Sequence, residues 1–314
     1  MKTTFFLAGL FAALVNAHIA DSGFFPEEIE TVDISNSTFK HAGCGVSLHS
    51  HATDHFKQTI AALHHLNSNP RTPTQLVSHV ARTALITINV PTYFHIVTKQ
   101  SEAGTITKAM ATAQMTAMNA RYNPHGISFT LKGVTITAHD AWAVGAGSDD
   151  LAMKAALRKG TYNTLNIYFQ TDLSGGILGT CSLPSNIGPG TPDKSTYVSD
   201  GCNVQANTMP SGTIYGYNTG MTAVHETGHW LGLLHTFEGY SCTGNGDYVS
   251  DTPMESVSTD GCPTSPVKDS CPSQAGPDPI HNYMDYSVDA CYTTFTKGQV
   301  TRIQNLWTQY RKGR

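Results

Sequence analysis

Eleven residues decide the fold of this chain: His225-Glu226-Thr227-Gly228-His229-Trp230-Leu231-Gly232-Leu233-Leu234-His235. They follow the spacing H-E-x-x-H-x-x-G-x-x-H, in which each fixed position has a physical role. On an α-helix, residues four apart lie on the same face, so the imidazoles of His225 and His229 can bind one ion. Glu226 is rotated by about 100° around the helix, which places its carboxylate beside that ion.

The second half of the pattern supplies a third imidazole. Gly232 can adopt a positive φ without steric cost, so the helix can end there and the chain can turn sharply. The turn lets His235 approach the ion from another direction. Three neutral imidazoles leave the fourth position of a tetrahedral zinc ion open for water, which is typical of catalytic zinc sites. The pattern therefore predicts a zinc hydrolase in which Glu226 is the general base.

Three other interpretations of these residues stay open. An amphipathic core helix with incidental histidines explains the apolar positions, but not three imidazoles and a carboxylate at these spacings. A peptidase of the thermolysin type would use a downstream glutamate as the third ligand, and the candidates are Glu238 and Glu255. The chain could also be a secreted zinc-binding module with little or no turnover, although such a module has no need of Glu226.

The N-terminus has the features of a secretory signal peptide. Lys2 supplies a positive charge, residues 5–15 are apolar, and Val15-Asn16-Ala17 is a small-residue cleavage site. We therefore expect residues 1–17 to be a signal peptide and the mature chain to be secreted into the extracellular space. The apolar run is too short to cross a bilayer and no later segment is suited to it, so we expect no membrane insertion.

The composition excludes one class of partner. The chain has 314 residues, a formal net charge of −4 and only 13% charged residues, against roughly 25% in typical soluble proteins. Because nucleic-acid binding needs a basic face, we expect no nucleic-acid partner. We expect instead a monomer that acts on protein or peptide substrates. Asn36-Ser37-Thr38 is a candidate N-glycosylation site in a secreted chain.

The hydrophobic pattern divides the chain after the signal peptide into two parts. Residues 18–80 are polar and rich in histidine, with one candidate helix over about 54–66, and form an N-terminal extension. From about residue 81 to residue 314, alternating strands and amphipathic helices predict an α+β domain. The strand over residues 86–97 contains Pro91, which predicts a bulge or an edge position in the sheet.

Seven cysteines in a secreted chain indicate disulfide bonds with one cysteine left over. Cys44 stands alone in the N-terminal extension. The other six flank or follow the zinc motif, namely Cys181, Cys202, Cys242, Cys262, Cys271 and Cys291. Six cysteines can pair in many ways, so spacing by itself does not decide the connectivity.

The zinc motif, together with Asn282-Tyr283-Met284-Asp285-Tyr286 downstream, resembles the metzincin zinc peptidases. More narrowly, residues 221–302 resemble the pappalysin family in its small secreted, fungal-type branch of extracellular metalloproteases. The matching runs cover about a quarter of the chain: His235-Thr236-Phe237-Glu238-Gly239, Gly246-Asp247-Tyr248-Val249-Ser250-Asp251-Thr252-Pro253, Gly261-Cys262-Pro263, Asp269-Ser270-Cys271-Pro272, Asp278-Pro279-Ile280-His281-Asn282-Tyr283-Met284-Asp285-Tyr286 and Phe295-Thr296-Lys297-Gly298-Gln299.

This resemblance implies a metzincin-like α+β catalytic domain. Its twisted mixed sheet and active-site helix would lie in an upper subdomain, residues 81–235. An irregular, disulfide-stapled lower subdomain would follow over residues 236–314. The implied activity is zinc-dependent endopeptidase, with one catalytic zinc ion bound by His225, His229 and His235. Residues 18–80 match the family poorly and would be a pro-segment.

The same resemblance implies roles for individual residues. Met284 would form the Met-turn beneath the three imidazoles, and the Tyr286 hydroxyl would stabilise the oxyanion of the tetrahedral intermediate. An ordinary core methionine and an ordinary tyrosine are the alternatives. Asp247, Asp251 and Thr252 would supply oxygen ligands to a structural calcium ion. The alternative is that these three residues only cap turns.

The resemblance also bears on the cysteines. It implies the disulfide Cys262–Cys291, and with it the pairs Cys242–Cys271 and Cys181–Cys202. Related zymogens carry a Cys-Gly pair whose thiolate occupies the open zinc position, which implies that Cys44 is a latency ligand. Val46 departs from the threonine that the family usually has, and so a spare thiol remains the alternative.

Overall fold

The computed structural model describes residues 44–47, 50–68, 86–187 and 194–314; within the first two of these segments, side chains are described only for residues 56–65. The predicted signal peptide and the candidate glycosylation site at Asn36 lie outside the described residues. Within them, no helix is both long enough and apolar enough to cross a membrane.

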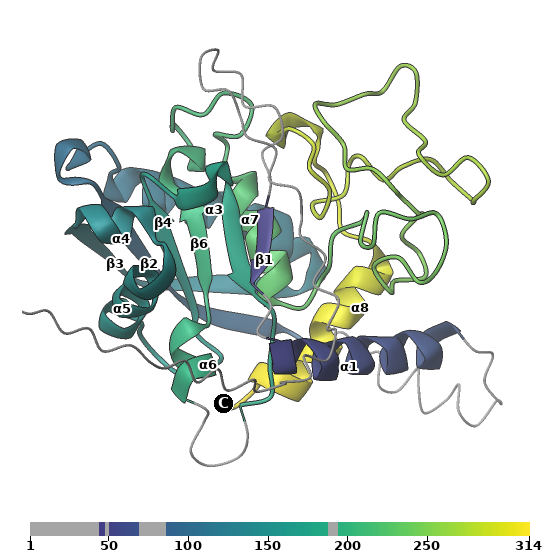
Figure 1. Cartoon of the computed structure of the whole chain (residues 1–314), viewed down its shortest axis with the longest axis horizontal. Helices are drawn as coiled ribbons and strands as arrows, with labels where there is room; N and C mark the ends of the chain where they lie inside the picture. Colours follow the sequence, from purple (N-terminus) through teal and green to yellow (C-terminus); the bar gives the residue numbers. More distant parts are fainter. Residues whose placement is uncertain (1–43, 48–49, 69–85, 188–193) are drawn as a thin grey trace, which may run out of the picture. The chain divides into compact units, whose positions relative to one another are not determined.

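The centre of the fold is a six-stranded mixed sheet with the strand order β1-β5-β6-β4-β2-β3 (Figure 1). Neighbouring strands are parallel, except that β5 is antiparallel to β6. The strands are β1 (Cys44–Ser47), β2 (Ile88–Thr98), β3 (Ile127–Ala138), β4 (Leu165–Gln170), β5 (Gly179–Ser182) and β6 (Cys202–Gln205). The predicted α+β class with a mixed sheet is therefore confirmed, and β1 adds a strand from the N-terminal extension.

Strand β2 shows how the sheet accommodates Pro91. The β2–β3 register shifts between Thr92 and Tyr93, but the extra residue is Lys132 of β3, so the bulge lies on the neighbouring strand and not on β2 as predicted. The predicted edge position is wrong, because β2 lies between β3 and β4. Pairing with β4 begins only at Thr92, so Pro91 precedes the part of β2 that is flanked on both sides. A residue without an N–H is tolerated at such a position.

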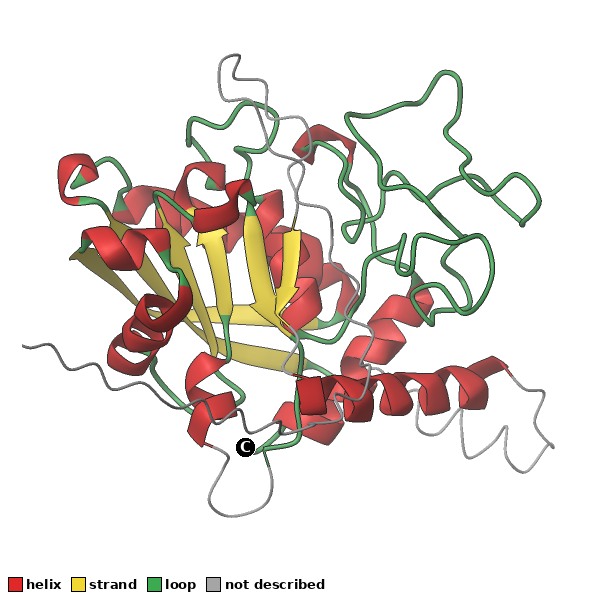
Figure 2. Ribbon diagram, viewed as in Figure 1, coloured by secondary structure: helices red, strands yellow, loops and turns green. Residues whose placement is uncertain are grey.

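Helices cover both faces of the sheet (Figure 2). α3 and α7 pack on one face, where the main hydrophobic core includes Phe94, Ile167 and Val224. α4 and α5 pack on the other face over a smaller core around Tyr168 and Met153. The helices are α1 (Ser50–Ser68), α3 (Lys108–Tyr122), α4 (Asp140–Val144), α5 (Gly147–Leu157), α6 (Lys194–Ser199), α7 (Met221–Trp230) and α8 (Lys297–Leu306), which continues as the π-helical turn η6 (Trp307–Arg311). Short 3₁₀ turns are η1 (Gln100–Glu102), η2 (Asn123–His125), η3 (Ser174–Gly176), η4 (Ala206–Thr208) and η5 (Asp289–Cys291).

Between α7 and α8 the chain is largely irregular, as predicted for the lower subdomain. Disulfide bonds join Cys242 to Cys271 and Cys262 to Cys291 in this region, and Cys181 to Cys202 between β5 and β6. All three predicted pairings are therefore confirmed. Such bonds stabilise a loop-rich region mainly by restricting its unfolded state.

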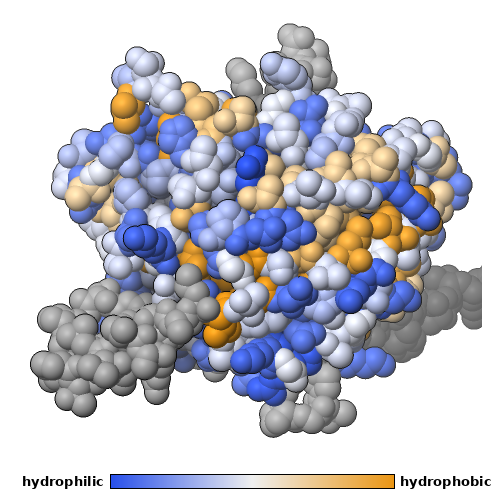
Figure 3. Space-filling view, turned by 180° about the vertical axis from the view of Figure 1, so that it is seen from behind, coloured by the Kyte–Doolittle hydropathy of each residue, from blue (hydrophilic) through white to orange (hydrophobic). Residues whose placement is uncertain are grey.

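The surface of the described residues carries both hydrophilic and hydrophobic side chains. Figure 3 shows the side opposite to that of Figure 1, on which hydrophobic residues form patches between hydrophilic ones. Among the exposed large hydrophobic side chains are Ile136 on the edge strand β3 and Leu151 on α5, each about half exposed. Single exposed residues of this kind are normal in soluble proteins.

Candidate metal centre

Three imidazoles converge at the end of helix α7. His225 and His229 lie one turn apart on α7, and their Nε2 atoms are 3.1 Å from each other. Gly232 adopts φ 101° directly after the helix and turns the chain back, as predicted. His235 then enters from the other side, with its Nε2 atom 3.1 Å from that of His229. A Cβ atom at Gly232 would also lie 2.2 Å from Leu306 Cδ1, so the turn has no room for a side chain.

The hydrogen bonds of the imidazoles determine which nitrogens carry protons. His225 Nδ1 lies 2.7 Å from the Tyr283 carbonyl oxygen, and His229 Nδ1 lies 2.9 Å from the Leu233 carbonyl oxygen. A carbonyl oxygen only accepts hydrogen bonds, so both Nδ1 atoms are protonated. In a neutral imidazole, the Nε2 atom is then unprotonated and carries a free lone pair. Two lone pairs 3.1 Å apart repel each other unless a cation lies between them.

Burial keeps these rings neutral. It lowers the pKa of His225 to about 4, and it lowers the pKa of His229 and His235 well below the usual value. Zinc binds imidazole nitrogens at about 2.0–2.1 Å, and tetrahedral angles then place its nitrogen ligands about 3.3–3.4 Å apart. The observed spacing of 3.1 Å is close to this value. The three histidines therefore fit a zinc ion.

The glutamates of the thermolysin-type alternative lie elsewhere. Among the described residues, the two clusters of potential metal ligands are the three histidines and a group formed by Cys262, His281 and Cys291. Neither cluster contains Glu238 or Glu255. The Glu255 carboxylate instead accepts hydrogen bonds from the Thr236 hydroxyl at 2.6 Å and from Lys268 at 2.6 Å. The two cysteines of the second cluster are joined in a disulfide bond and offer no thiolate.

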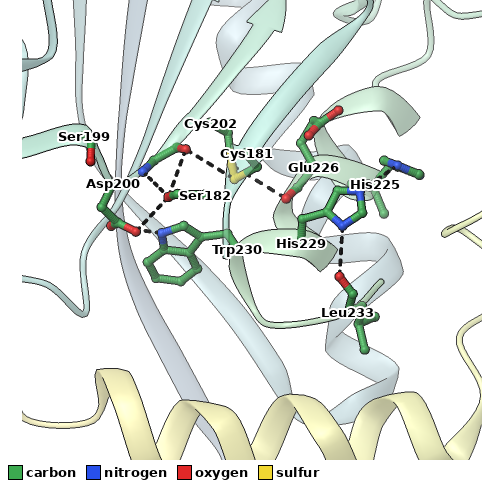
Figure 4. The surroundings of a disulfide bond; sticks show 12 residues. Cys181, Ser182, Ser199, Asp200, Cys202, His225, Glu226, His229, Trp230 and Leu233 are labelled. Carbon is green, nitrogen blue, oxygen red and sulfur yellow. Dashed lines mark hydrogen bonds between the residues drawn. A yellow bond between two sulfur atoms is a disulfide. The ribbon is translucent and has the colours of Figure 1, made fainter. Parts of the chain in front are cut away.

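Glu226 lies next to the histidines on α7, and its side chain is completely buried. Figure 4 shows its carboxylate beside His225, on the side of α7 that faces the Cys181–Cys202 disulfide bond. The carboxylate packs directly on the backbone of β5, because a Cβ atom at Gly179 would lie 2.4 Å from Glu226 Oε1. Strand β5 thus determines how closely this carboxylate approaches the sheet.

Met284 packs against helix α7, and Tyr286 lies beside two of the imidazoles. A Cβ atom at Gly228 of α7 would lie 2.4 Å from Met284 Sδ, so this glycine allows the methionine to pack against the helix. The ring centroid of Tyr286 is 5.0 Å from that of His235 and 5.8 Å from that of His225. The sequence-predicted group of three histidines, Glu226, Met284 and Tyr286 is therefore brought together in one place.

A pocket opens beside Glu226 and His225. Its walls are Leu178, Tyr217, Met221, Thr222, Tyr286, Asp289 and Tyr292. Asp289 is the charged residue of the wall, and burial raises the pKa of its carboxyl group. Its Oδ2 atom accepts hydrogen bonds from the Thr219 amide and hydroxyl, both at 2.8 Å, while Oδ1 has no hydrogen-bond partner among the described residues. Sequence reasoning missed Asp289, because no local motif distinguishes it from other turn aspartates.

The known proteins whose sequences are similar to this chain are metalloproteases. Residues 149–308 match the model of the peptidase M43 family, described as pregnancy-associated plasma protein-A. An extracellular metalloprotease of Neurospora crassa is 50% identical over 231 residues, which cover 73% of this chain and 78% of that protein. This chain belongs to the pappalysin family of metalloproteases.

Further relatives of this pappalysin have the same description. An extracellular metalloprotease of Aspergillus fumigatus is 45% identical over 265 residues, covering 76% of this chain and 81% of that protein. Among solved structures, mature mirolysin of Tannerella forsythia in complex with a cleaved peptide aligns with a TM-score of 0.58 and 27% identity. That alignment covers 71% of this chain and 92% of mirolysin.

A buried arginine contacts the end of helix α7 in this pappalysin. Arg311 of η6 is completely buried, and its Nε atom donates to the Trp230 carbonyl oxygen at 3.0 Å. Its guanidinium group stacks 3.6 Å from the Trp230 ring centroid and donates to the Tyr162 carbonyl oxygen at 3.0 Å. Trp230 directly follows the candidate ligand His229, so Arg311 ties η6 to the end of α7 beside the candidate metal centre.

Asp200 is the anion that balances Arg311. Its carboxylate accepts from Arg311 at 3.0 Å and from Arg158 at 3.2 Å. It also accepts from the Trp230 indole N–H at 3.1 Å (Figure 4). The Ser182 hydroxyl of β5 adds a hydrogen bond of 2.9 Å. Burial by itself would raise the pKa of Asp200, but the charges of Arg311 and Arg158 outweigh it and lower the pKa. Asp200 is therefore ionised at neutral pH.

The candidate calcium ligands are only partly brought together. Asp247 is buried, and its Oδ2 atom has no hydrogen-bond partner among the described residues. Burial raises the pKa of Asp247 to about 7, although the nearby Arg302 charge lowers it. Asp251, in contrast, accepts from the Thr296 hydroxyl at 2.7 Å and from the Gly298 amide at 2.9 Å, and so caps α8. Thr252 lies close enough to Asp247 for its hydroxyl to affect that pKa.

The candidate latency residue lies on β1. The backbone of Cys44 is opposite Gly179 of β5 in the parallel pairing of these strands, and Gly179 is the residue on which Glu226 packs. The side chain of Cys44 lies outside the described part of the chain. Its position relative to the three histidines stays a prediction.

Proposed function

We propose that this pappalysin is a secreted zinc endopeptidase. The observation that carries the proposal is the convergence of the bare Nε2 lone pairs of His225 and His229 with His235 beside a buried Glu226 carboxylate. Residues 1–17 would direct export, and Asn36 would carry a glycan. The names of the extracellular relatives support secretion.

Zinc, when bound by the three histidines, supplies Lewis-acid polarisation of the scissile carbonyl and makes water more acidic. Glu226 takes a proton from the attacking water and passes it to the leaving amine. Its tight packing on Gly179 restricts the carboxylate to one position beside the metal site. The Tyr286 hydroxyl donates a hydrogen bond to the developing oxyanion. Met284 packs beneath the site and takes no part in proton transfer.

Strand β5 aligns the substrate. It would be the edge strand of the sheet without β1, and an extended peptide can pair with such an edge through main-chain hydrogen bonds. The pocket next to Glu226 then receives one substrate side chain. Because Oδ1 of Asp289 has no described partner within this pocket, a basic substrate side chain is favoured there.

The N-terminal extension of residues 18–80 would hold the enzyme in a latent form. Strand β1 occupies the edge of β5 that an extended substrate needs. The thiolate of Cys44 would take the open zinc position, for which thiolate is an excellent ligand. A calcium ion bound near Asp247 and Thr252, with Asp251 beside them, is a separate part of the proposal. It would offset the cost of burying the Asp247 carboxylate.

The test of the catalytic role is Glu226→Gln. The amide keeps the size of the side chain but cannot accept the proton, so the variant should bind zinc normally and lose at least about two orders of magnitude in rate on casein. Glu238→Gln is the control, because Glu238 lies outside the metal cluster. Near-normal turnover in Glu226→Gln would refute the assigned base. Absence of any chelator-sensitive cleavage by the wild type, measured after removal of residues 18–80, would favour a zinc-binding module without turnover.

A further inference from the structure

Helix α1 of the N-terminal extension has one buried face. Phe56 and Ile60 lie one turn apart and are 2% and 0% exposed, and Leu63 is partly buried beside them. Lys57, Gln58, Ala62 and His65 on the other face are exposed. This arrangement is typical of an amphipathic helix that packs on a hydrophobic surface.

The surface under α1 belongs to the catalytic domain. It is formed by Leu183 after β5, Leu234, Leu306 of α8 and Tyr310 of η6, none more than 6% exposed, with Tyr248 partly buried at its margin. We call this surface the α1 groove. Figure 1 shows α1 beside α8 and the C-terminal end of the chain.

Polar contacts at the margin of the α1 groove fix the position of α1 on the catalytic domain. The Thr59 hydroxyl is 2.8 Å from the Tyr310 hydroxyl, and His64 Nδ1 is 3.0 Å from the Tyr248 carbonyl oxygen. The His64 ring also meets the Tyr248 ring edge to face. A hydrophobic centre with polar contacts at its margin is the usual organisation of a specific binding interface.

Two residues of the α1 groove adjoin the candidate metal centre. Leu234 immediately precedes the ligand His235, and Leu306 is the residue that fills the space beside Gly232. Removal of α1 would expose these leucines together with Leu183 and Tyr310. Large contiguous apolar patches are rare on soluble monomers and usually mark binding sites.

We propose that the α1 groove is a helix-binding site that keeps the extension on the enzyme after the chain between α1 and β2 has been cut. Phe56, Ile60 and Leu63 act as the anchor residues of a helix-in-groove interaction. While α1 stays bound, β1 remains at high local concentration beside the edge of β5. Cleavage alone therefore does not free the substrate edge; α1 must also leave the groove. The role of β1 in this inference rests on the proposed latency. The binding of α1 to the groove does not depend on it.

The experiment uses the full-length chain with a recognition site for an added, specific protease inserted within residues 69–85, in the Glu226→Gln background. After cutting, the catalytic domain is separated by size-exclusion chromatography and its bound peptides are identified by mass spectrometry. Ile60→Asp places a charge in the centre of the α1 groove. Ala62→Asp places the same charge on the exposed face of the same helix and is the matched control.

The fragment that contains residues 56–65 should co-elute with the domain in the parent chain and in Ala62→Asp. Ile60→Asp should weaken its retention at least about tenfold, because a fully buried isoleucine is lost. If Ile60→Asp is not secreted, an excess of a synthetic peptide of residues 50–68 should displace the parent fragment, and the same peptide with Ile60→Asp should not. Loss of the fragment from the parent chain, equal retention in Ile60→Asp or equal displacement by both peptides would overturn the proposal. Retention is measured by mass, so its failure is distinct from a failure of catalysis or latency.

Discussion

Replacing Arg311 by methionine should destabilise the domain and loosen the end of helix α7. Methionine keeps much of the length of the side chain but removes its charge and all its N–H donors. The Asp200 carboxylate then loses its hydrogen bonds from Arg311 at 3.0 and 3.3 Å, and the Trp230 and Tyr162 carbonyl oxygens lose theirs at 3.0 Å. All of these atoms are in the buried interior, where water cannot easily replace the lost donors.

The change in the free energy of unfolding depends on the hydrogen bonds that Asp200 keeps in the variant. Removal of one partner of a buried ion pair costs about 3–5 kcal/mol. Arg158, Trp230 and Ser182 continue to bond Asp200, so we expect the lower end of this range, about 3 kcal/mol in the free energy of unfolding. For a domain of this size each kcal/mol lowers Tm by about 2–4 °C, which gives a decrease of roughly 6–12 °C.

Thermal and urea-induced unfolding at pH 7 measure this difference. Lys312→Met is the matched control, because it removes a positive charge from the exposed neighbouring residue and should change stability by less than about 0.5 kcal/mol. The folded-state pKa of Asp200 is lowered, so the stability that its ionised form contributes is present above the unfolded pKa of about 3.9 and is lost as the pH falls through the folded pKa. The wild type should therefore lose its advantage over Arg311→Met only in acid. A loss at pH 7 below about 1 kcal/mol, or an equal loss in Lys312→Met, would refute the reasoning.

Other parts of the site make separate predictions. Gly179→Ala should retain zinc but lower kcat at least about tenfold, because the new Cβ atom would lie 2.4 Å from Glu226 Oε1; unchanged kcat would show that the carboxylate position is not critical. Asp289→Asn should reduce the preference for basic side chains in cleavage-site profiling at least about tenfold, and an unaltered profile would exclude Asp289 from specificity. Burial raises the pKa of Asp247 to about 7. Without calcium, the free energy of unfolding should therefore fall as the pH rises from about 4 toward 7, and it should fall less in Asp247→Asn. Added calcium should then stabilise the wild type but not Asp247→Asn above pH 7, and equal Tm values with and without calcium would contradict a calcium site.

The metal centre was predictable because its ligands lie within one short motif. The helical period places His225 and His229 together, and Gly232 has the positive φ that the turn requires. The Asp200–Arg311 pair was not predictable, since its residues are 111 positions apart and neither belongs to a local pattern. Ion pairs of this kind depend on how whole elements pack, and hydrophobic periodicity does not encode them.

The sheet was predictable in class but not in detail. Alternation predicted the strand that forms β2, but the bulge near Pro91 lies on β3, where Lys132 is the extra residue. The central position of β2 was missed, because a sequence does not reveal that β4 begins to pair only after the proline. The sequence also gave no indication that β1 would join the sheet, since a four-residue strand has too short an alternation to detect.

If three neutral imidazoles bind one zinc ion, the metal content of the freshly purified protein must show it, and inductively coupled plasma mass spectrometry measures that content. We expect one zinc ion per chain in the wild type and in Glu226→Gln, and almost none in His235→Ala. A wild-type protein that contains no zinc and takes up none on titration, or a His235→Ala variant that binds zinc normally, would contradict it.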